Sequence, residues 1–125
     1  MGVRVLILED NPLIAFDLQA ILEGEGHEVV GVCDTLVEAR RRLADEFDFA
    51  LLDVDLTDGK SFEVASALHD RHIPFAFVSA STRGEVPRHL RDVHFIAKPY
   101  REAAIVESVV VERHLSARAL AALGA

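Results

Sequence analysis

Cysteine and long apolar runs are almost absent from this sequence. The 125 residues include a single cysteine, Cys33, which excludes an internal disulfide and is expected to be a small buried apolar residue. No apolar run approaches the ~20 residues that a membrane-spanning helix requires. No signal-peptide pattern precedes the first strand-like segment, and no Ser or Thr stands at the spacing that myristoylation of Gly2 requires. We therefore expect a cytoplasmic protein without membrane contact.

Basic residues are also in short supply. The formal net charge is −8 at pH 7, from 13 Lys and Arg against 21 Asp and Glu. The one basic cluster, Arg40–Arg42, would point in different directions on a helix and is expected to be solvated. Nucleic acids bind to basic surfaces, so we expect no nucleic-acid binding by this domain. An acidic chain suits a metal cation or a basic partner surface instead.

Apolar residues are plentiful and follow a regular pattern. They make up 50% of the chain, which is enough for the core of one domain of ordinary size. Short apolar runs alternate with segments of helical periodicity, and this predicts βαβ units around a parallel sheet. Five strands of this size fit the flavodoxin-like (βα)5 fold, an α/β class with a doubly wound parallel sheet of order 2-1-3-4-5. The expected strands are Val3–Leu8, Val29–Val32, Phe49–Asp53, Phe75–Ser79 and Val93–Ile96.

Capping residues and proline predict where the helices begin. Pro12 is suited to the first position of the first helix, Asp34 or Thr35 can cap the second, and Ser61 can cap the third. A long helix is expected to close the chain, and its apolar breadth permits a homodimer. Its main apolar residues are Ile105, Val106, Val109, Val110 and Leu115.

The segment between the fourth and fifth expected strands is the least helical part of the pattern. Gly84 and Pro87 interrupt it, and only Val86 and Leu90 would anchor a helix there. Little apolar burial means low local stability. We therefore expect a short or labile fourth helix.

Acidic residues stand at the ends of two strands that the predicted order makes neighbours. Glu9 and Asp10 follow the first strand, and Asp53 ends the third. Sheets of this kind keep their chemistry in the loops past the carboxyl ends of the strands. Three carboxylates so placed repel one another unless a cation lies among them, and hard oxygen ligands suit Mg²⁺ shared with a phosphate. We expect a Mg²⁺ site here, with Asp53 as a phosphoryl acceptor.

Two further strand ends supply groups that would serve such an acceptor. Lys98, one of only two lysines, can neutralise an aspartate and later pair with its phosphoryl group. Ser79 offers a hydroxyl to a phosphoryl oxygen. These groups match phosphoryl transfer, which demands positioning and charge neutralisation. Asp55 lies two residues past the acceptor, near the path of an attacking water, and is expected to tune the lifetime of the phosphoryl group.

These residues, in this order, resemble the receiver domain of two-component response regulators, and the resemblance covers residues 1–125 as one domain. It implies that a sensor histidine kinase or a histidine phosphotransfer protein donates the phosphoryl group. It also implies that Asp10, Asp53 and the backbone carbonyl of Asp55 bind Mg²⁺, with Glu9 acting partly through water. The family's motifs correspond here to the acidic pair Glu9-Asp10, the phosphoacceptor Asp53, the Ser/Thr switch Ser79, the aromatic switch Phe95 and the pair Lys98-Pro99.

The resemblance further implies a signalling switch rather than an enzyme that acts on other molecules. The chain would catalyse only its own phosphorylation and dephosphorylation. Ser79 and Lys98 would reorient toward the phosphoryl oxygens, and Phe95 would turn inward. The face formed by the fourth helix, fifth strand and fifth helix would then regulate a downstream protein partner in a phosphorelay.

Two stretches refine this resemblance. Pro74–Ala80 is similar to a receiver subgroup rich in single-domain regulators, which has a Phe-Ala-Thr-Gly-like motif; Ala80 stands where that subgroup has Gly. The loop Val54–Gly59 departs from most receivers, because Thr57 replaces a Pro and the loop is shorter. The resemblance therefore leaves the shape of this loop open.

Two other functions compete with the switch. Asp53–Thr57 also resembles the Asp-x-Asp-x-Thr signature of haloacid-dehalogenase-type phosphohydrolases, with Asp53 as nucleophile. That family places the motif on its first strand and needs a second acidic pair downstream, whereas here no paired acids follow Lys98. A flavodoxin-like nucleotide-binding module would need a glycine-rich or hydroxyl-rich loop after the first strand, and Glu9-Asp10 would repel a phosphate there unless a metal intervened.

Overall fold

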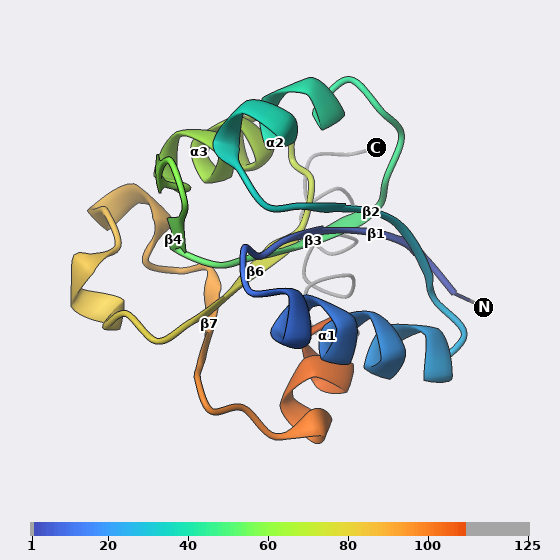
Figure 1. Cartoon of the computed structure of the whole chain (residues 1–125). Helices are drawn as coiled ribbons and strands as arrows, with labels where there is room; N and C mark the ends of the chain where they lie inside the picture. Colours follow the sequence, from blue (N-terminus) through green and yellow to red (C-terminus); the bar gives the residue numbers. More distant parts are fainter. Residues whose placement is uncertain (1, 110–125) are drawn as a thin grey trace, which may run out of the picture.

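The computed structural model describes residues 2–109, which form an α/β fold around one parallel sheet (Figure 1). The sheet has five strands in the order β2-β1-β3-β6-β7, and every neighbouring pair is parallel. Counted among themselves, these strands follow the order 2-1-3-4-5, so the predicted topology is confirmed. The strands are β1 (Arg4–Leu8), β2 (Glu28–Cys33), β3 (Phe49–Leu52), β6 (Phe75–Ser79) and β7 (His94–Ala97).

Helices cover both faces of the sheet (Figure 1). On one face, α1 (Pro12–Gly24) and the helical residues 102–109 bury Leu18, Leu22 and Ile105 against β1 and β3. On the other face, α2 (Leu36–Arg42) and α3 (Phe62–Asp70) form a second apolar layer. The central strand β3 is buried along its whole length, as expected for a strand of a parallel sheet that is covered on both sides.

Two of the predicted helix starts are confirmed, and one predicted cap is corrected. Thr35 caps α2, because its side chain accepts a hydrogen bond from the backbone N–H of Glu38 at 3.2 Å. Pro12 opens α1 as predicted, and Asn11 is its cap. Ser61 stands at the cap position of α3, but its side chain makes no capping bond. The Ser61 hydroxyl instead donates to the backbone carbonyl of Asp53 at 2.6 Å.

Between β6 and β7 the chain forms two short 3₁₀ turns, η1 (Arg83–Glu85) and η2 (Arg88–Leu90), and no α-helix. Val86 and Leu90 are the buried anchors, with 2% and 0% of their surface exposed. The guanidinium of Arg91 donates to the carbonyls of Val86 and Gly84 and so closes the segment on itself. Two 3₁₀ turns therefore stand where a short or labile fourth helix was predicted, and the low stability of the segment stays a prediction.

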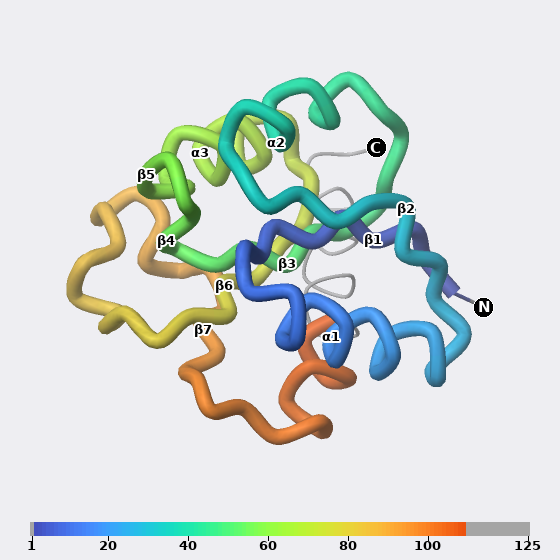
Figure 2. The backbone as a smooth tube through the Cα atoms, viewed as in Figure 1, coloured from blue at the N-terminus to red at the C-terminus, as the bar shows by residue number. Residues whose placement is uncertain are grey.

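A small hairpin interrupts the passage from β3 to α3. Strands β4 (Asp55–Leu56) and β5 (Gly59–Lys60) pair antiparallel around a two-residue turn. Figure 2 shows this hairpin beside α2 and α3, above the end of β3. This hairpin is the conformation of the loop Val54–Gly59, whose shape the resemblance left open.

Three further expectations concern membrane-spanning helices, Cys33 and the last helix. Within residues 2–109 no helix is long and apolar enough to cross a membrane. Cys33 is fully buried, as predicted. Of the apolar residues expected in the last helix, Ile105 and Val109 are buried in the core, whereas Val110 and Leu115 lie outside the described residues.

Candidate functional site

Strands β1 and β3 end side by side, and this brings Glu9 and Asp53 together. Leu8 and Leu52 are partners in the register of the two strands. The backbone N–H of Asp53 donates to the carbonyl of Leu8 at 2.9 Å, and the N–H of Glu9 donates to the carbonyl of Cys33 at 2.9 Å. Backbone hydrogen bonds on both strands therefore fix where the Glu9 and Asp53 side chains begin.

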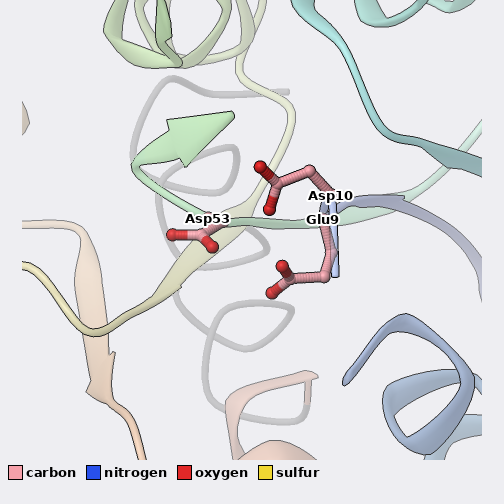
Figure 3. A group of neighbouring side chains, drawn as sticks. All are labelled: Glu9, Asp10 and Asp53. Atoms are coloured by element: carbon pink, nitrogen blue, oxygen red, sulfur yellow. The ribbon is translucent and has the colours of Figure 1, made fainter. Parts of the chain in front are cut away.

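The three predicted carboxylates surround one common space (Figure 3). One oxygen from each of Glu9, Asp10 and Asp53 lies within 4.8 Å of the others. Glu9 and Asp53 are buried, with 2% and 8% of their surface exposed, whereas Asp10 is open to solvent. Two buried carboxylates that face a third are costly unless cations neutralise them.

Lys98 supplies one of those cations from the end of β7. Its Nζ donates to Glu9 Oε1 at 2.6 Å and to Asp53 Oδ2 at 2.8 Å, and only 14% of its side chain is exposed. The backbone N–H of Lys98 donates to the carbonyl of Ser79 at 2.9 Å, which ties this strand end to that of β6. The ammonium therefore lies between the two buried carboxylates.

Asp53 has hydrogen-bond partners on both of its oxygens. Oδ2 accepts from Lys98, while Oδ1 accepts from the hydroxyl of Ser79 at 2.8 Å and from the backbone N–H of Asp55 at 3.3 Å. The Ser79 hydroxyl in turn accepts from the backbone N–H of Ser81 at 3.1 Å. The acceptor carboxylate is thus held by groups from three different strand ends.

The electrostatics of the site follow from burial and from the single lysine. Burial raises the pKa of Glu9, and the nearby charge of Asp53 adds to this, although the hydrogen bond from Lys98 works in the opposite direction. Burial alone would lower the pKa of Lys98, but its hydrogen bonds to Asp53 and Glu9 outweigh burial and raise it. One ammonium faces three carboxylates, so the site retains an excess of negative charge.

This donor set fits a hard divalent cation. Glu9, Asp10 and Asp53 offer carboxylate oxygens within 4.8 Å of one another, and Lys98 neutralises only part of their charge. Oxygen-only ligands with excess negative charge are typical of Mg²⁺ sites. The acidic cluster can therefore hold a metal ion.

The hairpin β4–β5 adds contacts that the sequence pattern did not reveal. The Asp55 carboxylate accepts from the ammonium of Lys60 and from the hydroxyl of Ser81. The hydroxyl of Thr57 donates to Asp10 Oδ2 at 3.3 Å. The dipeptide Asp58-Gly59 could have predicted this hairpin, because Asp-Gly is common in the turns of hairpins.

The hairpin is anchored to α2 by its turn. Asp58 accepts from the backbone N–H of Leu36 at 2.7 Å and from that of Val37 at 3.3 Å. The nitrogens at the start of a helix lack partners within the helix, so a carboxylate from another segment can satisfy them. The turn of the hairpin is therefore fixed to the start of α2.

The predicted aromatic switch residue lies apart from this cluster. Phe95 is on β7, half-buried, and its ring centroid is 6.2 Å from that of Phe77 on β6. The structure therefore brings six of the predicted residues, the acceptor among them, together in one cluster. Phe95 lies outside this cluster, on β7. The six are Glu9, Asp10, Asp53, Asp55, Ser79 and Lys98.

Comparisons with known proteins agree with this arrangement. The family model of the response regulator receiver domain matches residues 5–110. The phyllosphere-induced regulator PhyR of Methylorubrum extorquens is 37% identical over 124 residues, which cover 92% of this chain and 44% of that protein. The transcriptional regulatory protein PdtaR of Mycobacterium tuberculosis is 29% identical over 112 residues, which cover 85% of this chain and 54% of that protein. The chain thus spans about half the length of these curated relatives.

Solved structures give the same result. The solution structure of SdrG from Sphingomonas melonis is similar with a TM-score of 0.77 and 36% identity, and the match covers 87% of this chain and 94% of that one. The crystal structure of the response regulator PhyR from Brucella abortus has a TM-score of 0.78 and 31% identity, and covers 98% of this chain and 52% of that one. With its fold, its site and its relatives in agreement, the chain belongs to the response regulator receiver domain family.

Proposed function

We propose that this receiver domain, residues 1–125, is switched by transfer of a phosphoryl group to Asp53. The donor is a phosphohistidine of a sensor histidine kinase or of a histidine phosphotransfer protein. The observation that carries the proposal is the environment of Asp53, whose carboxylate is held by Lys98 on one oxygen and by Ser79 on the other. A carboxylate held in this way is positioned to attack phosphorus in line, which is most of what phosphoryl transfer asks of a protein.

Mg²⁺ is the proposed cofactor. Glu9, Asp10 and Asp53 would hold it together with the backbone carbonyl of Asp55, and Thr57 would help to orient Asp10. The ion would offset the negative charge of the phosphoryl oxygens. The excess negative charge of the three carboxylates over the single ammonium supports this assignment.

The chain's own residues perform the remaining work of the switch. Lys98 keeps its positive charge beside Asp53 and offers it to the new phosphoryl oxygens. The hydroxyl of Ser79, now on Asp53 Oδ1, turns toward a phosphoryl oxygen and draws its loop with it. Phe95 then turns inward beside Phe77. These movements change the face formed by η1, η2, β7 and the helical residues 102–109.

That face is proposed to regulate a downstream protein partner by a shift in population between two arrangements. The chain acts as a switch that catalyses only its own phosphorylation and dephosphorylation. The comparisons bring no support for the haloacid-dehalogenase-type alternative. A cytoplasmic location stays a prediction.

Transfer from a labelled histidine kinase tests the proposal. The chain should take the label in Mg²⁺ and lose that ability when Asp53 is changed to Asn. Asp70→Asn is a matched control, because Asp70 is an exposed aspartate on α3, away from the strand ends. Equal labelling of the wild type and Asp53→Asn would refute the proposal.

A further inference from the structure

The Asp55 carboxylate bridges two segments that lie beside the acceptor. Its Oδ1 accepts from Lys60 of β5, and its Oδ2 accepts from Ser81 of the loop after β6. Asp55 also contacts the acceptor directly, since its backbone N–H donates to Asp53 Oδ1 at 3.3 Å. Half of the Asp55 side chain is exposed, so this bridge lies at the protein surface, next to the buried acceptor.

The two ends of the bridge are anchored in different ways. Lys60 belongs to the hairpin, whose turn is fixed to α2 by the two hydrogen bonds of Asp58. Gly59 lies so close to Leu36 that an added Cβ would come within 3.3 Å of that side chain. Ser81 belongs to the loop that moves when Ser79 turns. Lys60 therefore keeps its hold on Asp55 even when Ser81 departs with its loop.

Lys60 and Asp55 also carry opposite charges and form an ion pair. Among residues 2–109, Asp55 is the only carboxylate within ion-pair distance of the Lys60 ammonium. Lys60 and Lys98 are the only lysines, and Lys98 serves Asp53 and Glu9. One lysine therefore holds the acceptor and the other holds the carboxylate that follows it.

We propose that Lys60 is a positioning residue that sets the lifetime of the phosphoryl group on Asp53 by holding the Asp55 carboxylate in this bridge. The inference rests on the function proposed above and adds a residue to which the family motifs assign nothing.

The reaction that it controls is hydrolysis of the acyl phosphate. A water oxygen forms a bond to phosphorus while the bond from phosphorus to the Asp53 oxygen breaks. The electron pair of that bond returns to the Asp53 carboxylate, inorganic phosphate leaves, and the water proton passes to solvent. An in-line attack brings the water from the side of the phosphorus opposite Asp53.

The bridge acts on that approach. With Lys60 in place, one oxygen of Asp55 is fixed to the hairpin and the pair covers the path of the water. Without Lys60, the carboxylate is free to turn, bind the incoming water and orient it toward phosphorus. Loss of Lys60 therefore accelerates dephosphorylation.

The test measures the half-life of the full chain after it has been labelled with acetyl phosphate in Mg²⁺. Lys60→Met should shorten the half-life about threefold to tenfold, which is the lower part of the range that coupling between two contacting side chains spans. Lys60→Arg keeps the ion pair and should restore the half-life to near the wild-type value. Ser81→Ala, which opens the other end of the bridge, should shorten the half-life less than Lys60→Met, because the hairpin still holds Asp55.

A double-mutant cycle separates positioning from a general loss of structure. In an Asp55→Asn background, Lys60→Met should leave the half-life unchanged, because the group that Lys60 positions is no longer a carboxylate. Equal shortening in both backgrounds, or a wild-type half-life in Lys60→Met, would overturn this inference while leaving Asp53 as the acceptor. Failure of the wild type to take any label would overturn the proposed function and this inference with it.

Discussion

The ammonium of Lys98 lies 2.8 Å from Asp53 Oδ2, and this pair joins the ends of β7 and β3 across β6. The same ammonium is 2.6 Å from Glu9, so one cation holds two buried carboxylates in place. Removal of a partner from a buried ion pair is costly because it leaves charge without compensation. The site is therefore part of what stabilises the sheet edge, as well as the place where chemistry is proposed.

Lys98→Met should lower the free energy of unfolding by about 3 kcal/mol in a buffer without divalent cations. Urea denaturation measures this. Mg²⁺ should recover part of the loss, because a metal ion can replace the ammonium as the neutralising charge. Lys60→Met is the matched control and should lose far less, since its pair is half exposed. A Lys98→Met protein as stable as the wild type would show that the pair does not hold the strand ends.

Asp10, the most exposed carboxylate of the cluster, should contribute to the Mg²⁺ dependence of labelling. Asp10→Asn should raise the Mg²⁺ concentration for half-maximal labelling by about tenfold or more, because loss of a ligand costs at least as much as loss of an outer-shell partner. A titration of labelling against Mg²⁺ measures this, with Asp70→Asn as the control. An unchanged midpoint would remove Asp10 from the metal site.

The segment between β6 and β7 should exchange its amide hydrogens quickly. Its two 3₁₀ turns are three residues each and rest on Val86 and Leu90 alone as buried anchors. Segments with few buried contacts open at low free energy. Hydrogen exchange measured by mass spectrometry should show less protection across residues 83–91 than across β3. Comparable protection in the two segments would show a stable element here.

The single cysteine gives a pH-dependent stability term. Burial raises the pKa of the Cys33 thiol to about 11, and the charge of Arg42 offsets this in part. An unfolded thiol has a pKa of about 8.5, so the unfolded chain releases its proton first as pH rises. The contribution is therefore fully present below about pH 8.5 and is lost as pH rises toward 11. Urea midpoints at pH 8 and pH 10.5 should show a larger loss for the wild type than for Cys33→Ala. Equal losses in the two proteins would contradict it.

Much of this architecture follows from local pattern. The apolar runs ending at Leu8 and Leu52, with helical periodicity between them, were enough to predict that Glu9 and Asp53 end side by side, because the strand order of such a fold is limited. Ser79 and Lys98 followed from the same reasoning. These residues stand at strand ends, where sequence position nearly determines spatial position.

The parts that sequence did not predict depend on contacts between distant segments. Asp58 stabilises the start of α2 from 22 residues away, and Ser81 reaches Asp55 across 26. Ser61 was expected to cap its own helix, but the hairpin brings its hydroxyl to the carbonyl of Asp53 instead. Such contacts depend on how the loops fold back over the sheet. Residue type alone does not say which residues will meet.

The most direct test of the central claim is to locate the phosphoryl group. The wild-type chain would be labelled with acetyl phosphate in Mg²⁺, reduced with borohydride to convert the acyl phosphate into a stable alcohol, and digested for mass spectrometry. The account predicts one modified residue, Asp53, and none in Asp53→Asn. Modification at another aspartate in the wild type, with Asp53 intact, would contradict it.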